Sequence, residues 1–155
     1  MNVVNTPIYT KIKSAPDGSL VFLASAPETF GVIIGRDGDN RVFGCVSSKD
    51  PKELGRHWPL MPDTACFSFG TEWLVETDLS KGVSSSIDDA GVLLLGPHGP
   101  EFRFRSTKAG GDVLIFNTAG KVSNPGDLVA LKGWRIWASL DARNQRGICP
   151  LIDRS

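Results

Sequence analysis

Glycine and proline divide this sequence into many short apolar segments, and this feature constrains the fold more than any other. The 155 residues include 17 glycines and 10 prolines. The segments between them are rich in valine, isoleucine, phenylalanine, tryptophan and leucine, which favour extended structure. Short runs of this kind between turn residues are typical of strands joined by tight turns. No segment has the sustained apolar periodicity of a long helix.

We therefore predict an all-β fold, a sandwich or closed barrel of about ten to twelve short antiparallel strands. A mixed α+β domain with one short helix is the alternative. No change of composition separates two domains, so residues 1–155 are expected to form a single one. Two segments, 49–54 and 84–90, could each form a helical turn. Strands are expected at 8–13, 19–24, 30–35, 41–47, 65–69, 73–76, 91–95, 101–106, 112–117, 128–131, 134–140 and 147–152.

Two of these segments alternate clearly between their faces. In 101–106, Phe102 and Phe104 are expected on one face of the strand and Arg103 and Arg105 on the other. In 134–140, Trp134 and every second residue after it share a face.

Arg135 and Trp137 fall on the opposite face of that segment, where Trp137 is either covered by a loop or presented to a partner. Tryptophan and arginine are enriched at interface hot spots. Arg103, Arg105, Arg135 and Trp137 are therefore predicted to form a basic-aromatic binding patch. A solvated row of arginines on an ordinary sheet is the alternative.

The charge balance bears on which partners to expect. Seventeen basic and seventeen acidic residues cancel, whereas proteins that bind nucleic acid through its phosphates usually carry a basic excess. The apolar runs are too short to cross a bilayer, and the N-terminal residues lack the apolar stretch of a signal peptide. We expect a cytoplasmic protein that binds neither nucleic acid nor membrane.

Only two histidines are present, and neither lies in a known catalytic motif. His57 adjoins Trp58 in a proline-rich connection, and both are candidate binding residues. A nucleophilic pair of Cys66 and His57 is chemically feasible, but a buried thiol and a loop histidine fit the local sequence better. His98 lies between glycine and proline and is expected in a turn.

Cofactor and metal signatures are absent from the sequence. The segment 37–40 (Asp-Gly-Asp-Asn) begins like a calcium loop but lacks the later ligands, so a hairpin turn is expected there. Three widely spaced cysteines, Cys45, Cys66 and Cys149, form no metal-binding pair and are expected to be buried and reduced; one disulfide is the alternative. We predict no metal and no cofactor.

Two classes of function remain open. The first is a non-enzymatic protein-binding or assembly module, such as a phage or viral accessory protein or an inhibitor of another protein, acting on a protein partner or by self-association. The second is a β-barrel that binds a small molecule or sugar, possibly a hydrolase, using His57, Glu72, Glu101 and the arginines. The first is preferred because a compact β scaffold with neutral charge and outward tryptophan and arginine suits protein binding.

Overall fold

Strands dominate the computed structural model, which describes residues 6–26, 28–83, 93–96, 99–107, 113–117 and 129–154. The predicted all-β fold is thereby confirmed. Within these residues no helix combines the length and apolar character needed to traverse a bilayer. The elements are β1 (Ile8–Lys11), the 3-10 turn η1 (Ile12–Ser14), β2 (Leu20–Leu23), β3 (Phe30–Asp37), β4 (Asn40–Ser47), β5 (Arg56–Leu60), β6 (Ala65–Ser68), β7 (Leu74–Val83), β8 (Leu93–Gly96), β9 (Gly99–Ser106), β10 (Val113–Asn117), β11 (Val129–Trp137), α1 (Leu140–Asn144) and β12 (Ile152–Asp153).

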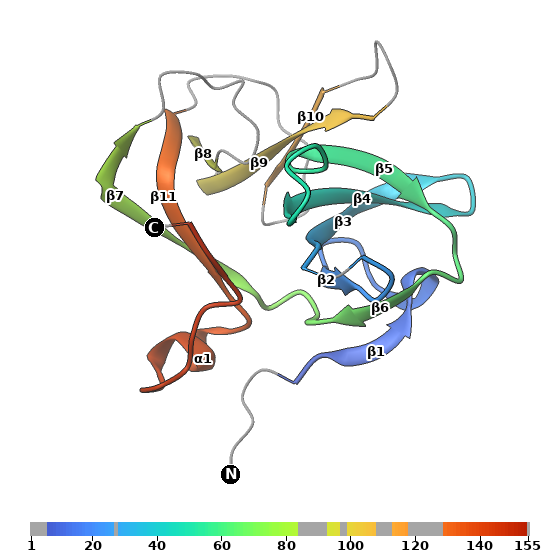
Figure 1. Cartoon of the computed structure of the whole chain (residues 1–155), viewed down its shortest axis with the longest axis horizontal. Coiled ribbons are helices and arrows are strands. Elements are labelled where there is room, and N and C mark those ends of the chain that lie inside the picture. Colours follow the sequence, from blue (N-terminus) through green and yellow to red (C-terminus); the bar gives the residue numbers. More distant parts are fainter. Residues whose placement is uncertain are drawn as a thin grey trace.

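These strands form one continuous sheet that folds back on itself (Figure 1). Its order is β1-β6-β2-β3-β4-β5-β9-β8-β11-β12, with β10 added beside β9 and β7 beside β11. The path ends at β1 and β12, so the described strands do not close into a barrel. Every pair is antiparallel except β5 with β9, which is parallel and joins the two halves of the sheet.

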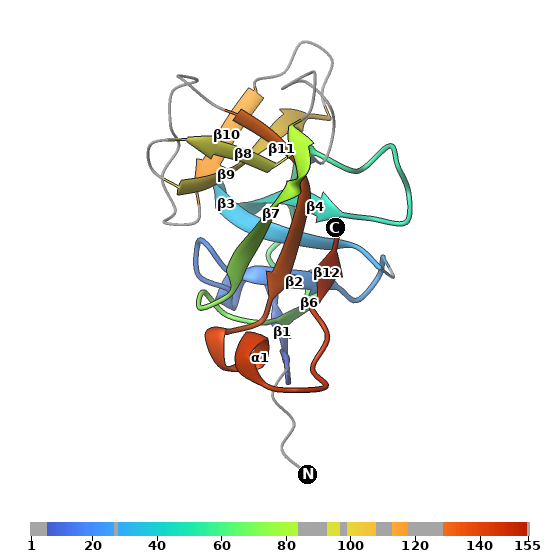
Figure 2. The ribbon, with the colours of Figure 1, turned by 90° about the vertical axis from the view of Figure 1, so that its left-hand side faces the viewer.

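The β2–β3–β4 ladder has an apolar core on each face. In β4, Phe43 and Cys45 belong to a small core and Val46 to a large one, as expected from the alternation of a strand. The large core also takes residues from β8, β9 and β11, which face this ladder. Figure 2 shows β7 and β11 running across the strands behind them. A sheet buried on both faces explains why so short a domain contains unbroken apolar runs.

The hairpin turn predicted at 37–40 is present, and another turn lies at Gly18. The residues Asp37 and Asn40 pair across the β3–β4 hairpin, and Gly38 takes the positive φ of 60° that its turn requires. Gly18 has a φ of 85°, and its carbonyl accepts a hydrogen bond of 2.7 Å from the indole N–H of Trp73. The turn predicted around His98 lies outside the described residues.

The inward and outward faces of 101–106 and 134–137 agree with prediction. Phe102, Phe104, Trp134 and Ile136 are all buried in the large core. The predicted strand 134–140 ends early, however, at Trp137. The Ser139 hydroxyl accepts a hydrogen bond of 3.1 Å from the amide of Ala142 and thereby caps α1, which leaves Leu140 exposed rather than inward.

Several element boundaries differ from the prediction. Strand β5 lies in the proline-rich connection where none was expected, and 128–131 joins 134–137 in the single strand β11. The strand predicted at 147–152 is reduced to β12. Residues 49–54 form hydrogen-bonded turns instead of a helix, with the Asp50 carboxylate accepting from the Lys52 amide at 2.9 Å. The helical turn predicted at 84–90 lies outside the described residues.

The three cysteines are free thiols, but they are not all buried. Cys45 and Cys66 lie in the small core, whereas Cys149 is exposed, which corrects the expectation of three buried thiols. Cys149 lies between α1 and β12, and its exposure could not be inferred from its residue type.

Candidate functional site

Arg103 and Arg105 lie on the outer face of β9, opposite the buried phenylalanines. Arg105 pairs in register with Arg56 of β5, whose guanidinium donates to the carbonyl of Ser106 at 3.4 Å. Arg56 and Arg105 are exposed, and Arg103 is half-buried. The parallel β5–β9 contact thus adds a third arginine, Arg56, that sequence reasoning did not place there.

Arg135 and Trp137 lie elsewhere, on the part of β11 that pairs with β7 and β12. The indole N–H of Trp137 donates to the Glu76 carboxylate at 2.7 Å, and Arg143 donates to the other oxygen of Glu76 at 3.3 Å. The guanidinium of Arg135 donates to Asp153 at 3.3 Å. Strand β8 lies between β11 and β9 in the sheet, so Arg135 and Trp137 are not on a strand that pairs with the arginines of β9.

His57 and Trp58 point to opposite faces of β5. Trp58 packs edge-on against Phe43, with ring centres 5.0 Å apart, beside the small core that also contains Cys66. The side chain of His57 is half-buried and lies on the other face of β5. Its register partners are Gly44 on β4 and Ser106 on β9. Burial also raises the pKa of the Cys66 thiol, which disfavours the thiolate. The structure therefore separates His57 from Cys66 and does not form a nucleophilic pair.

Glu101 is completely buried on β9. Among the described residues, neither oxygen of its carboxylate has a hydrogen-bond partner. Its register partner on β8 is Leu94, which is also buried. Glu72, the other carboxylate considered from sequence, is exposed in the connection between β6 and β7.

An aromatic strip crosses four neighbouring strands on the face that carries the large core. The rings of Tyr9 on β1, Phe67 on β6, Phe22 on β2 and Phe30 on β3 follow one another through directly paired positions. Their centres are 5.3, 6.3 and 4.9 Å apart, and Phe30 lies 6.1 Å from Phe69. We call these five residues the aromatic strip.

The strip is most exposed at the edge of the sheet. Its four phenylalanines are half-buried, and two of them, Phe30 and Phe69, pack against the large core, whereas Tyr9 is 60 % exposed. Ile8, the next residue on β1, is 71 % exposed. The strip therefore runs from the core out to an open strand at the end of the sheet, β1 (Figure 1).

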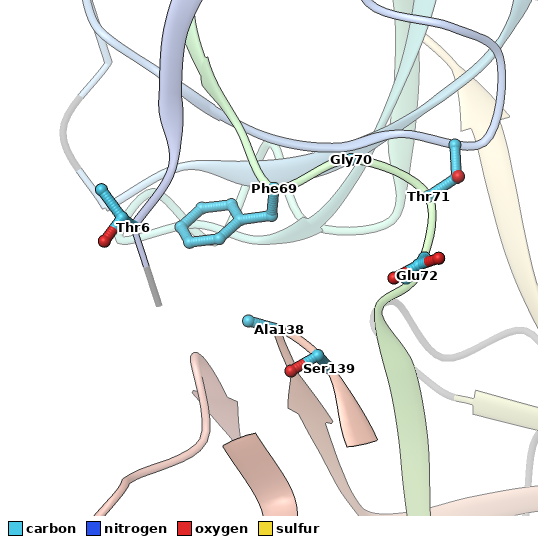
Figure 3. A pocket seen from close by; sticks show the side chains of 7 residues that line it. All are labelled: Thr6, Phe69, Gly70, Thr71, Glu72, Ala138 and Ser139. Atoms are coloured by element: carbon cyan, nitrogen blue, oxygen red, sulfur yellow. The ribbon is translucent and has the colours of Figure 1, made fainter. Parts of the chain in front are cut away.

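Two pockets adjoin the strip and share Thr6, Phe69 and Gly70. The larger, of about 440 Å³, separates Phe69 and Glu72 from Ala138 and Ser139 (Figure 3). The smaller, of about 340 Å³, lies along the side of β1 that carries Ile8 and Thr10. The residues that line the larger pocket are Thr6, Phe69, Gly70, Thr71, Glu72, Ala138 and Ser139.

Sequence reasoning did not nominate the aromatic strip. Each ring lies in or beside a predicted strand, but the strip exists only because β6, late in the sequence, is inserted between β1 and β2. Register between strands so distant in sequence leaves no local signal. The one available hint was that Tyr9, Phe22 and Phe67 each place a large ring within a predicted strand.

Comparisons with protein-family models, with curated proteins and with solved structures found no match. Among the described residues, no three histidine, cysteine, aspartate or glutamate side chains converge where they could hold a metal ion.

Proposed function

We propose that this chain is a non-enzymatic protein-binding module and that the aromatic strip is its contact surface. The observation that carries the proposal is the continuous row of rings that ends in an exposed tyrosine at an open sheet edge. Rings that only stabilised the fold would be covered by other parts of the domain. Contiguous exposed apolar surface on a folded domain usually marks an interaction site.

The residue types of the strip suit recognition of a protein. Tyrosine and phenylalanine offer a large contact area at a small cost in side-chain entropy, and tyrosine is enriched at interface hot spots. The pocket beside β1, on the face opposite Tyr9, adds polar groups near this edge, because it is lined by Thr6, Thr10, Ser14 and Ser68.

The strip is favoured over the residues nominated from sequence. Trp137 and Arg135 already donate hydrogen bonds to Glu76 and Asp153, so a partner would have to compete with these contacts. Tyr9 extends beyond its ring contact with Phe67 and can contact a partner without breaking any contact of the fold. The arginines of β5 and β9 stay candidates for a secondary contact.

The test compares two exposed apolar positions at opposite parts of the sheet. Tagged wild-type protein, Tyr9→Ala and Leu79→Ala are used to recover partners from the source lysate, and the recovered protein is then purified for calorimetry. Leu79 on β7 is 66 % exposed and lies outside the strip, which makes it the matched control. We expect Tyr9→Ala to weaken binding by at least about tenfold, as for a hot-spot tyrosine.

The free energy of unfolding of both variants should lie within about 0.5 kcal/mol of the wild-type value, because substitutions at exposed positions perturb stability little. Equal loss of binding in both variants, or none in either, would contradict the proposal. Light scattering over a concentration series shows whether the recovered partner is a second copy of the chain.

A second candidate function, binding of a small polar ligand such as a sugar, is favoured by the larger pocket. The Phe69 ring could stack on a sugar face, and the Glu72 carboxylate and Ser139 hydroxyl lie nearby as hydrogen-bonding groups (Figure 3). This function requires ligand binding that Glu72→Gln abolishes and Tyr9→Ala leaves intact. The two candidates are thus separated by the same set of variants.

A further inference from the structure

Strand β1 presents an unpaired edge beside the aromatic strip. It is the first strand in the order of the sheet and pairs with β6 alone among the described strands. An open edge carries backbone N–H and C=O groups that can pair with another extended chain. The register of β1 with β6 decides which of these groups face outward.

Backbone groups of Tyr9 and Lys11 face the open edge. The amide of Ile12 donates to the carbonyl of Thr64 at 2.8 Å, and the constant register of β1 with β6 pairs Thr10 with Cys66 and Ile8 with Ser68. Hydrogen-bonded pairs alternate in an antiparallel ladder. Ile8 and Thr10 therefore bond to β6, and the N–H and C=O groups of the residues between them point away from it.

The other side of β6 supports the same assignment. The amide of Phe69 donates to the carbonyl of Leu20 on β2 at 2.9 Å. By the same alternation Phe67 bonds to β2, which leaves the backbone groups of Cys66 and Ser68 for β1. The two ladders that flank β6 are thus consistent with each other.

The two faces of β1 offer different environments to an added strand. On one face lie Tyr9 and the strip, and on the other the pocket of about 340 Å³ lined by Ile8 and Thr10. Successive side chains of an extended segment would contact these two environments in turn. Backbone hydrogen bonds at an edge with pockets for alternate side chains form a recurring mode of peptide recognition.

The positive charge of Lys11 at this edge favours a partner that carries a negative charge. Lys11 is exposed beside Tyr9 on the strip face, and no ion pair involving it occurs within the described residues. The next lysine, Lys13, is held by Asp63 at 2.9 Å. A carboxylate on the partner can pair with Lys11, whereas a second copy of β1 would bring another lysine to the same edge, which opposes self-pairing.

We propose that this edge binds an extended peptide segment of the partner, with alternating apolar residues and a carboxylate beside Lys11, that continues the sheet next to β1. This inference rests on the proposed function, of which it specifies the partner chemistry and the binding mode. The hydrogen bonds come from the backbone of Tyr9 and Lys11, and the selectivity comes from the strip, the pocket and the lysine.

The first experiment selects binders from a displayed library of random dodecapeptides against the full chain. We expect enrichment of sequences with alternating apolar residues and at least one acidic residue. The most enriched peptide is then synthesised and titrated into labelled protein. On saturation, the amides of Tyr9 and Lys11 should exchange with solvent about tenfold more slowly, as expected for newly formed hydrogen bonds, while Met61, exposed outside this edge, stays unchanged.

The second experiment measures the affinity of that peptide for two variants at one position. Lys11→Pro removes the outward N–H and the charge, and Lys11→Gln removes the charge alone. Lys11 has extended backbone angles (φ −96°, ψ 148°), so proline requires little adjustment, and circular dichroism checks that the variant folds. We expect Lys11→Gln to weaken binding several-fold and Lys11→Pro by about a further fivefold to tenfold.

The outcomes separate this inference from the function on which it rests. If Tyr9→Ala weakens binding of the recovered partner but Lys11→Pro does not, the module binds through its strip and strand addition is wrong. If neither variant changes binding, both proposals fail. Three further results would contradict binding of an extended acidic segment. These are enrichment of basic or proline-rich peptides, no enrichment at all, and a dimer of this chain that Lys11→Pro dissociates.

Discussion

Glu101 is the residue whose position is hardest to reconcile with stability alone. It is completely buried, it has no hydrogen-bond partner among the described residues, and it pairs in register with Leu94 on β8 and Asn117 on β10. Burying a carboxylate without a partner opposes folding by several kcal/mol. Sequence reasoning named Glu101 only with His57, Glu72 and the arginines, as a group that a ligand-binding barrel would use.

Replacing Glu101 with leucine should therefore stabilise the fold. Leucine has a similar size and needs no partner, so we expect the free energy of unfolding to rise by about 1–3 kcal/mol. Urea unfolding of Glu101→Leu measures the change, and Glu72→Leu, at an exposed position, is the control that should stay within about 0.5 kcal/mol. A destabilised Glu101→Leu would show that the carboxylate is held by a group outside the described residues.

At the scale of elements, β5 shows how neighbours can form a strand that its own sequence does not favour. Its five residues include Pro59 and lack an alternating pattern. The carbonyl of His57 accepts a hydrogen bond of 3.2 Å from the amide of Thr107, which follows β9. Backbone groups of every second residue in a strand point to the same side, so the nitrogen of Pro59 also points toward β9. At that position β5 has passed the residues of β9 with which it pairs. The missing N–H of proline therefore costs no ladder bond.

Packing between β4 and β9 also depends on one glycine. A Cβ atom at Gly44 would lie 2.6 Å from the ring of Phe104. Gly44→Ala should therefore push the two strands apart and lower the free energy of unfolding by about 1–3 kcal/mol, as overpacking does. Thermal and urea unfolding measure this loss. A double variant with Phe104→Leu should recover part of it, and no recovery would place the strain elsewhere.

The whole molecule contains two cores on opposite faces of one ladder, and two of its thiols report on the small core. Cys45 and Cys66 are both buried in the small core. Burial, with a smaller contribution from Glu53, raises the pKa of Cys45 to about 12. Only the thiolate reacts readily with disulfide reagents, so both core thiols are protected until the small core opens.

Thiol titration at mildly alkaline pH should find one fast-reacting cysteine, Cys149, in the native protein and three after denaturation. Because the pKa of Cys45 lies well above that pH, its thiol stays protonated while the protein is folded. Cys149→Ser should remove the fast reaction and leave two slow thiols. Three fast thiols in the native protein would contradict the small core, and fewer than three in denaturant would reveal a disulfide.

The sequence by itself determined the strand content, the inward faces of β9 and β11 and the β3–β4 turn. These features follow from local patterns: alternation along a strand and the conformational freedom of Gly38 in its hairpin. The arginines and Trp137 nominated from sequence also lie in strands as expected, whereas His57 and Trp58 lie in β5, where no strand was predicted. What alternation could not show is which outward side chains become neighbours.

Only the tertiary structure decided the candidate site. Tyr9, Phe67, Phe22 and Phe30 are brought into one row by the insertion of β6 between β1 and β2, and the same arrangement leaves β1 at the edge. Strand order likewise places Trp137 on a strand that does not pair directly with β9. Pairing between distant strands is chosen by the burial of whole faces and by closure of the intervening chain, so no local segment of sequence contains it.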